Sequence, residues 1–79
     1  MMTSSEIIIK RIKDLCDERK ITINKLATLS GITQSTLSNI IHATNKNPRV
    51  DTLCKIANGF GMTLSEFFDF HEMNNIVID

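Results

Sequence analysis

The chain has 79 residues, which predicts one small domain, and its 42% hydrophobic and 23% charged residues are typical of a globular protein. No apolar run approaches the roughly 18 residues that span a bilayer, and no basic segment of a secretory signal precedes Ile7, so we expect a cytoplasmic protein without membrane contact. The formal net charge is zero, which by itself does not favour nucleic acid as a partner.

The distribution of charge is uneven along the chain. All nine basic residues lie within residues 10–55, beside four acidic ones, whereas residues 56–79 hold four acidic residues and no lysine or arginine. Because salt screens charges beyond roughly 8–10 Å, a DNA duplex responds to the local charge and not to the sum over the chain. This distribution permits DNA binding by the first two-thirds of the chain, with an ordinary solvated surface as the alternative.

The two cysteines do not form a metal-binding motif. Cys16 and Cys54 are 38 positions apart, and neither is part of a CxxC pair. Buried, reduced thiols are the expected state, with a disulfide or metal site as the alternative. We expect no cofactor, and we interpret His42 and His71 as surface residues.

Helical spacing begins near the N-terminus. Ile8, Ile12, Leu15 and Cys16 recur at the spacing of an amphipathic helix over about residues 5–19, capped by Ser4 or Ser5.

Two shorter helices follow, separated by a glycine. Thr22 is a good N-cap for a helix over 23–29, with Leu26, Ala27 and Leu29 turned inward, and Gly31 can end it in the left-handed conformation. Thr33 then caps a helix that runs to about residue 42, with a core face that consists of Leu37 and Ile40.

A polar loop over 43–49 separates these helices from two more. A helix over about 51–60 is expected to bury an apolar set and to stop at Gly61; the set is Val50, Leu53, Ile56, Ala57 and Phe60. Thr63 and Glu66 have the spacing of a capping box, so a further helix is expected from Leu64, with Phe67 and Phe68 on its apolar face. The prediction is an all-α fold of five helices.

The most informative unit is the pair of helices around Gly31. Two helices joined by a short glycine turn cross steeply, so that the second can project from the body. Its outer face carries uncharged side chains that form hydrogen bonds: Gln34, Ser35, Thr36, Ser38 and Asn39. Such side chains suit the major groove of DNA, where glutamine can bond adenine through two atoms and serine or threonine can serve several bases.

This pattern resembles the phage-repressor-like helix-turn-helix family, the Cro, lambda-repressor-like or xenobiotic-response-element type. The matching residues begin with Ile12, Leu15, Thr22, Leu26 and Ala27, continue with Gly31–Gln34 and Leu37–Ile40, and end with Asn47, Pro48, Leu53, Ile56, Ala57, Phe60, Gly61 and Thr63–Phe68. The resemblance covers roughly residues 6–69. It implies a compact five-helix domain, placed at 1–72, with a short C-terminal tail over 73–79.

The resemblance also implies a function. Family members insert the third helix into the major groove and usually act as dimers on near-palindromic operators. We therefore expect a sequence-specific regulator of transcription, most simply a repressor, that binds double-stranded DNA as a homodimer.

Residue by residue, the resemblance assigns two kinds of DNA contact. The side chains expected to read bases are Gln34, Ser35, Thr36, Ser38 and Asn39. Those expected to contact phosphates are Thr22, Lys25, Thr33, Asn45, Lys46 and Arg49. Apart from the resemblance, Lys10, Arg11 and Lys13 are expected to solvate the first helix, and of these Arg11 is the candidate for a phosphate contact.

The chain departs from the family pattern in three ways. Ile23 stands where glutamine often contacts a phosphate, and Ala43 where a glycine often ends the third helix. Cys16 and Ile41 stand where an arginine–glutamate pair often links the first and third helices. An apolar Cys16–Ile41 contact is expected in its place, since such an exchange is often neutral or stabilising.

The C-terminal region leaves alternatives open. Phe70 with Ile76, Val77 and Ile78 is either a dimer contact or part of an unstructured end. The acidic, phenylalanine-rich residues 64–79 also fit an antitoxin or another protein-interaction module with a protein partner. An enzyme is not expected, because no catalytic arrangement, metal-ligand spacing or phosphate loop is visible.

Overall fold

The computed structural model describes residues 4–42 and 48–74. Within these ranges it contains six helices and no strand. The helices are α1 (Ser4–Arg19), α2 (Ile23–Ser30), α3 (Gln34–Ile41), α4 (Val50–Gly59), α5 (Leu64–Phe68) and α6 (His71–Asn74). The all-α prediction is confirmed, and the helix missed from the sequence is α6.

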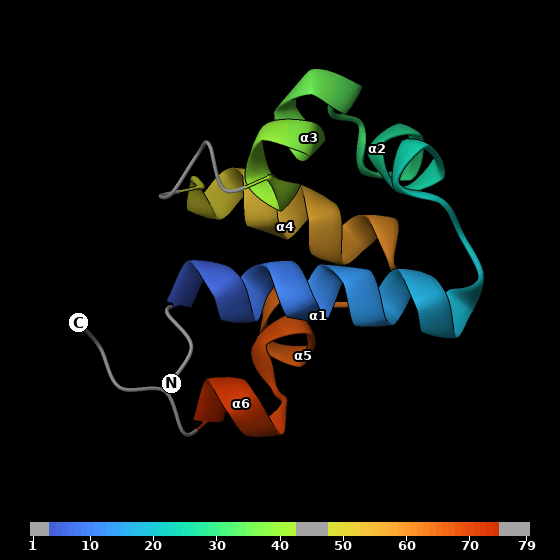
Figure 1. The fold of residues 1–79 in the computed structure, drawn as a ribbon. Coiled ribbons are helices and arrows are strands. Elements are labelled where there is room, and N and C mark those ends of the chain that lie inside the picture. Colours follow the sequence, from blue (N-terminus) through green and yellow to red (C-terminus); the bar gives the residue numbers. More distant parts are fainter. Residues whose placement is uncertain (1–3, 43–47, 75–79) are drawn as a thin grey trace.

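Figure 1 shows α1 lying across the middle of the molecule. Helices α2, α3 and α4 lie on one side of it, and α5 and α6 on the other. Helix α2 packs against α3 and α4, α5 packs against α4, and α6 packs against α1. None of the described helices is long and apolar enough to cross a membrane.

One apolar core joins α1 to α5. Its buried members are Ile12, Leu15, Cys16, Leu26, Ala27, Leu37, Ile40, Leu53, Ile56, Ala57, Phe60 and Phe67. All of them were predicted from helical spacing. Ile7 is buried as well, whereas Ile8, Leu64 and Phe68 are half-buried against the cluster. Burial raises the pKa of the Cys16 thiol, which favours its protonated form.

Three predicted helix starts and the predicted end of α2 are confirmed at their caps, whereas Ser4 and Ser5, predicted to cap the first helix, lie within α1. Thr22, Thr33 and Thr63 each accept a hydrogen bond from the backbone N–H three residues later. The Glu66 carboxylate in turn accepts a hydrogen bond from the Thr63 backbone N–H, which completes the capping box of α5. Gly31 ends α2 at φ 71° and ψ 29°, a left-handed conformation that glycine adopts at little steric cost.

Two apolar residues predicted to be buried are exposed. Leu29 is 49% exposed and Val50 is 66% exposed. Helix α2 turns Leu26, Ala27 and Ser30 inward, so Leu29 lies about 100° around the helix from Ser30. Val50 is the first residue of α4, one turn before Leu53, the first α4 residue that reaches the core.

Ser30 takes the inward position because α4 offers it a glycine. A Cβ atom added to Gly59 would collide with Ser30 Oγ and would lie 3.1 Å from the Ser30 backbone nitrogen. The two helices therefore approach more closely than any larger residue at 59 would allow. Within the described residues, the buried Ser30 Oγ has no hydrogen-bond partner.

Two arginines of α1 secure the ends of later helices. Arg19 donates to the Phe60 carbonyl after α4 and lies over the Phe60 ring. Arg11 donates through Nε to the Phe67 carbonyl at 2.8 Å and through Nη2 to the Glu66 carbonyl at 3.1 Å. The guanidinium groups thus satisfy carbonyls that a helix leaves without partners at its C-terminal end.

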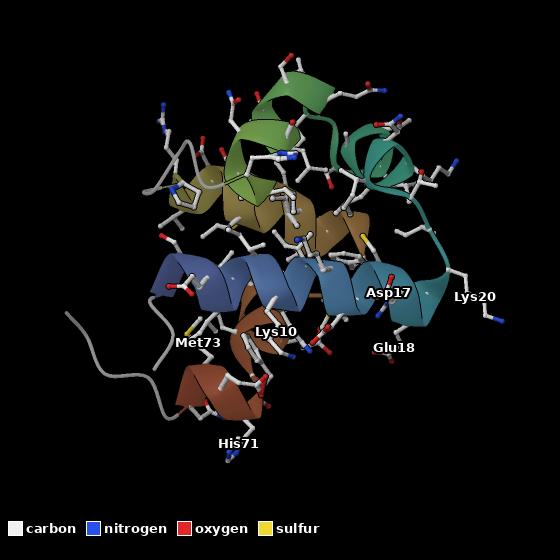
Figure 2. All side chains as sticks on the ribbon, viewed as in Figure 1. Lys10, Asp17, Glu18, Lys20, His71 and Met73 are labelled. Atoms are coloured by element: carbon white, nitrogen blue, oxygen red, sulfur yellow. The ribbon has the colours of Figure 1, made fainter. Side chains whose placement is uncertain are left out.

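Helix α6 spans the predicted boundary between the domain (residues 1–72) and the C-terminal tail (residues 73–79). Lys10 of α1 forms an ion pair with Glu72 at 3.3 Å, and the Asn74 backbone N–H donates to the Phe70 carbonyl. Figure 2 shows Lys10 on the side of α1 that faces α6. A four-residue helix has little stability of its own, so these contacts, which no sequence periodicity reveals, account for it.

Candidate nucleic-acid interface

The unit predicted from the sequence forms two helices joined by a tight turn. Helix α2 ends with the Gly31 N–H donating to the Thr28 carbonyl and the Ile32 N–H donating to the Ala27 carbonyl. Thr33 then begins α3 through its side-chain cap. Because the turn is closed by backbone hydrogen bonds, α3 is held in a defined direction relative to α2.

Helix α3 is anchored on one face and open on the other. Leu37 and Ile40 are buried in the core, one helical turn apart. Gln34, Ser35, Ser38 and Asn39 are exposed. Figure 1 shows α3 on the side of α1 opposite to α6, with no helix covering its outer side in that view.

A groove of about 480 Å³ lies between α3 and the first turn of α2. It is lined by Ile23, Asn24, Gln34, Ser35, Ser38, Asn39, Ile41 and His42. The structure thus brings together four of the five residues predicted to read bases.

Thr36, the fifth of these residues, does not line the groove. It is half-buried, and its hydroxyl accepts a hydrogen bond from the Thr33 hydroxyl at 2.8 Å. Residues 34, 35, 38 and 39 share one helical face, while Thr36 lies beside the cap of α3. Its position differs from that of the other candidates for this geometric reason.

Sequence reasoning missed four groove residues, one of which, Ile41, was predicted only to contact Cys16. Ile23 and Asn24 begin α2, and His42 follows α3 one turn after Ser38. The position of His42 could have been found from helical periodicity. Ile23 and Asn24 come from a different helix, and only the crossing of α2 and α3 brings them to the groove.

His42 is exposed, as expected, and its ring is held by α3. Its Nδ1 lies 2.9 Å from the Ser38 carbonyl and 3.3 Å from the Ser38 hydroxyl. Because a carbonyl oxygen can only accept, Nδ1 donates to it in this arrangement. His42 therefore extends the row of polar groups along α3.

The two helices that form the groove are almost without charge. Within residues 21–42 the single charged residue is Lys25, whereas α5 and α6 with their connection hold Glu66, Asp69 and Glu72 and no lysine or arginine. In Figure 1, α5 and α6 lie across α1 from α3. A polyanion would therefore meet no carboxylate from α2 or α3, and three carboxylates on the opposite side.

The lysine of α1 that faces α6 is already paired. Lys10 contacts both Asp14 and Glu72, and these hydrogen bonds raise the pKa of its amine. Figure 2 also places Glu18 on the side of α1 away from α3, and shows His71 pointing away from the body there. This side offers little attraction to phosphate.

The residues predicted to contact phosphates fall into several places. Thr22, Lys25 and Thr33 are exposed on α2 and α3 or at their caps. Arg49 is exposed just before α4 and lies 3.4 Å from a carboxylate oxygen of Asp51. The predictions for Asn45 and Lys46 fall outside the described residues.

Arg11 does not lie with these residues. Its guanidinium donates to the two carbonyls at the end of α5 and lies over the Phe70 ring, 4.7 Å from the ring centre. Since α5 lies across α1 from α3, the structure gives Arg11 a role in the fold and does not bring it to the groove.

The contact between Arg11 and Phe70 concerns the predicted dimer contact at the C-terminus, which included Phe70. Phe70 is half-buried beneath Arg11, and Phe67 is fully buried beside Phe60 and Phe68. Ile76, Val77 and Ile78, predicted to share a dimer contact with Phe70, fall outside the described residues. Cys16 is buried in the core and Ile41 packs against the same cluster, while a direct contact between them stays a prediction.

Comparisons with known proteins agree with this geometry. The family described as the Cro/C1-type HTH DNA-binding domain matches residues 11–72. A crystal structure of the prophage Lp1 protein 11 is similar over 96% of this chain and 100% of that one, with a TM-score of 0.82 and 32% sequence identity. Among curated proteins, none matches the chain.

Proposed function

The chain belongs to the Cro/C1-type helix-turn-helix DNA-binding family, and from this premise we propose that it is a sequence-specific regulator of transcription, most simply a repressor. It inserts α3 into the major groove of double-stranded DNA. Occupation of an operator by the protein then blocks access of the transcription machinery to the promoter.

The observation that carries this proposal is the composition of the groove. Gln34, Ser35, Ser38 and Asn39 present amides and hydroxyls from one exposed face of α3, with no charged side chain among the lining residues. Amides can both donate and accept, which matches the paired donors and acceptors on base edges. Gln34, in the first turn of α3, is suited to contact the N6 and N7 atoms of an adenine.

The surroundings of the groove can hold the phosphate backbone. The N-terminal end of α2 carries the partial positive charge of a helix start, and Lys25 lies in its first turn. Arg49 can exchange its exposed Asp51 partner for a phosphate at small cost, because exposed ion pairs contribute little to stability. These contacts position the protein without specifying sequence.

A homodimer suits the size of the molecule. The described fold extends 32 × 24 × 21 Å, and the half-sites of a dimeric operator lie about 34–36 Å apart. Two copies placed side by side along the duplex would therefore present their α3 helices to successive major grooves on one face. A dimer also doubles the phosphate contacts, which offsets the few basic residues of each copy.

Selection of binders from a randomised duplex library at physiological salt tests this function. We expect an enriched two-fold symmetric motif with half-sites about one helical turn apart. As a matched variant, Gln34→Ala should relax the preference at one position of each half-site and weaken binding of the selected site about tenfold to a hundredfold.

Two outcomes would count against the function. A pool without enrichment, with only salt-sensitive background binding, would remove sequence-specific recognition and favour a protein partner, as in the antitoxin alternative. An equal loss of affinity for every sequence in Gln34→Ala would remove the base-reading role of this residue. Nothing in the described C-terminal helices favours the protein-partner function, since Phe67 and Phe70 are engaged within the fold.

A further inference from the structure

We propose that Ile23 reads the C5-methyl group of a thymine in each half-site of the operator. The inference rests on the proposed function and names a specificity-determining residue outside the recognition helix. Its basis is the position of an isoleucine inside a groove that is otherwise lined mainly by polar side chains.

Ile23 is held firmly in place. It is the first residue of α2, directly after Thr22, whose hydroxyl accepts the Lys25 backbone N–H at 3.0 Å. Its side chain is half-buried and packs against the apolar core. A β-branched side chain in a helix has one strongly preferred rotamer, so Ile23 presents a fixed apolar surface to the groove.

Two aliphatic side chains of the groove can contact a methyl group. The groove lining holds Ile23 and Ile41 as aliphatic side chains, and its other members are asparagine, glutamine, serine and histidine. In the major groove, thymine differs from the other bases by its C5-methyl beside the O4 acceptor. Polar groups of α3 can bond the base edges while an isoleucine removes the adjacent methyl from water.

Ile23 suits this role better than a phosphate contact. Its side chain has neither donor nor charge, so it cannot bond a phosphate oxygen. Facing the amino group of a cytosine, it would leave a polar group without a partner, which disfavours that base. The geometry therefore both favours a methyl group and penalises its polar alternatives.

A cycle of DNA and protein changes tests the inference. In the selected operator, each thymine is replaced in turn by deoxyuridine, which removes only the methyl group. For the unmodified protein we expect a loss of about threefold to tenfold at one position of each half-site. In Ile23→Ala that loss should largely disappear, because the methyl group no longer meets an apolar surface.

Controls separate this role from a structural one. Ile41 lines the same groove. The variant Ile41→Val should therefore show the same loss of affinity with deoxyuridine, at the same operator position, as the unmodified protein. Replacing the thymine by 5-methylcytosine should retain more affinity than replacing it by cytosine. Thermal unfolding checks that Ile23→Ala stays folded, and Ile23→Val, which removes one methyl group, should give an intermediate deoxyuridine effect.

The outcomes distinguish the two proposals. A selected operator in which no thymine is sensitive to deoxyuridine, or an equal sensitivity in Ile23→Ala, would overturn the role of Ile23 and leave the proposed function standing. Failure to select any operator would overturn both.

Discussion

At the crossing of α2 and α4, a single glycine sets the distance between two helices. Gly59 lies in the last turn of α4, where glycine normally lowers helix stability by about 1 kcal/mol relative to alanine. Its place is explained by Ser30, whose Oγ occupies the space that a Cβ would need and whose backbone nitrogen and Cα would lie 3.1 and 3.2 Å from it. Since α2 begins the DNA-binding unit, this approach also fixes how that unit sits on the body.

We therefore expect Gly59→Ala to destabilise the protein, against the usual trend for glycine in a helix. The added methyl collides with Ser30, and forcing extra volume into packed helices costs roughly 1–3 kcal/mol. Denaturant unfolding followed by circular dichroism measures the change. A stability equal to or above that of the unmodified protein would show that the two helices separate freely.

Ser30→Ala is the matched control for this variant. It removes a buried hydroxyl without a hydrogen-bond partner among the described residues, so it should leave stability unchanged or raise it by about 1 kcal/mol. It should also reduce the cost of Gly59→Ala, because Ser30 Oγ is the closest obstacle. Strictly additive effects in the double variant would contradict direct contact between the two positions.

At the scale of elements, each helix end depends on a small set of backbone partners. Thr22 and Thr33 start the two helices of the DNA-binding unit, and Gly31 closes the turn between them. The start of α5 combines Thr63 with Glu66, whose carboxylate accepts the Thr63 backbone N–H at 2.9 Å. These hydrogen bonds with the backbone and side chain of Thr63 lower the pKa of Glu66.

This shift predicts an acid-sensitive start of α5. Because the pKa of Glu66 is lower in the folded state, its stabilising contribution is present above the unfolded value of about 4.3 and is lost as pH falls through the folded value. At pH 7 the melting temperature of Glu66→Gln should be lower than that of the unmodified protein, and this difference in melting temperature should vanish at pH 2–3. A difference in melting temperature that is independent of pH would contradict the account.

Features that depend on residues close together in the sequence could be predicted, and features that depend on residues far apart could not. Caps and turns such as Thr22, Gly31 and Thr63 act over a few residues, so the sequence alone predicted them. Leu29 was wrongly predicted to face inward, because Ser30 takes that position against Gly59, which lies on another helix. Helix α6 was missed for a similar reason, since its partner Lys10 lies near the other end of the chain.

The residues of the candidate site likewise include some that the sequence could predict and some that it could not. Gln34, Ser35, Ser38 and Asn39 share one face of one helix, and periodicity was sufficient to group them. Ile23 reaches the groove only through the crossing of α2 and α3, so spacing could not assign it. Arg11 looked available for phosphate because the sequence does not show that the end of α5 lies beside it.

At the scale of the whole molecule, charge and shape give the two sides different properties. The side of α2 and α3 presents polar, mostly uncharged side chains around a groove, whereas the side of α5 and α6 carries carboxylates. A molecule with no net charge can therefore approach a polyanion in one orientation. The central claim of this account is that the α2–α3 side is the one that meets DNA.

Titration of isotope-labelled protein with the selected duplex, followed by backbone amide NMR, tests this claim most directly. We expect the largest shifts at Ile23 and Asn24 and along Gln34–His42, with small changes in α5 and α6. The same duplex with its half-sites scrambled should give smaller shifts that disappear as salt is raised. Shifts concentrated in α5 and α6, with α3 unchanged, would contradict the account.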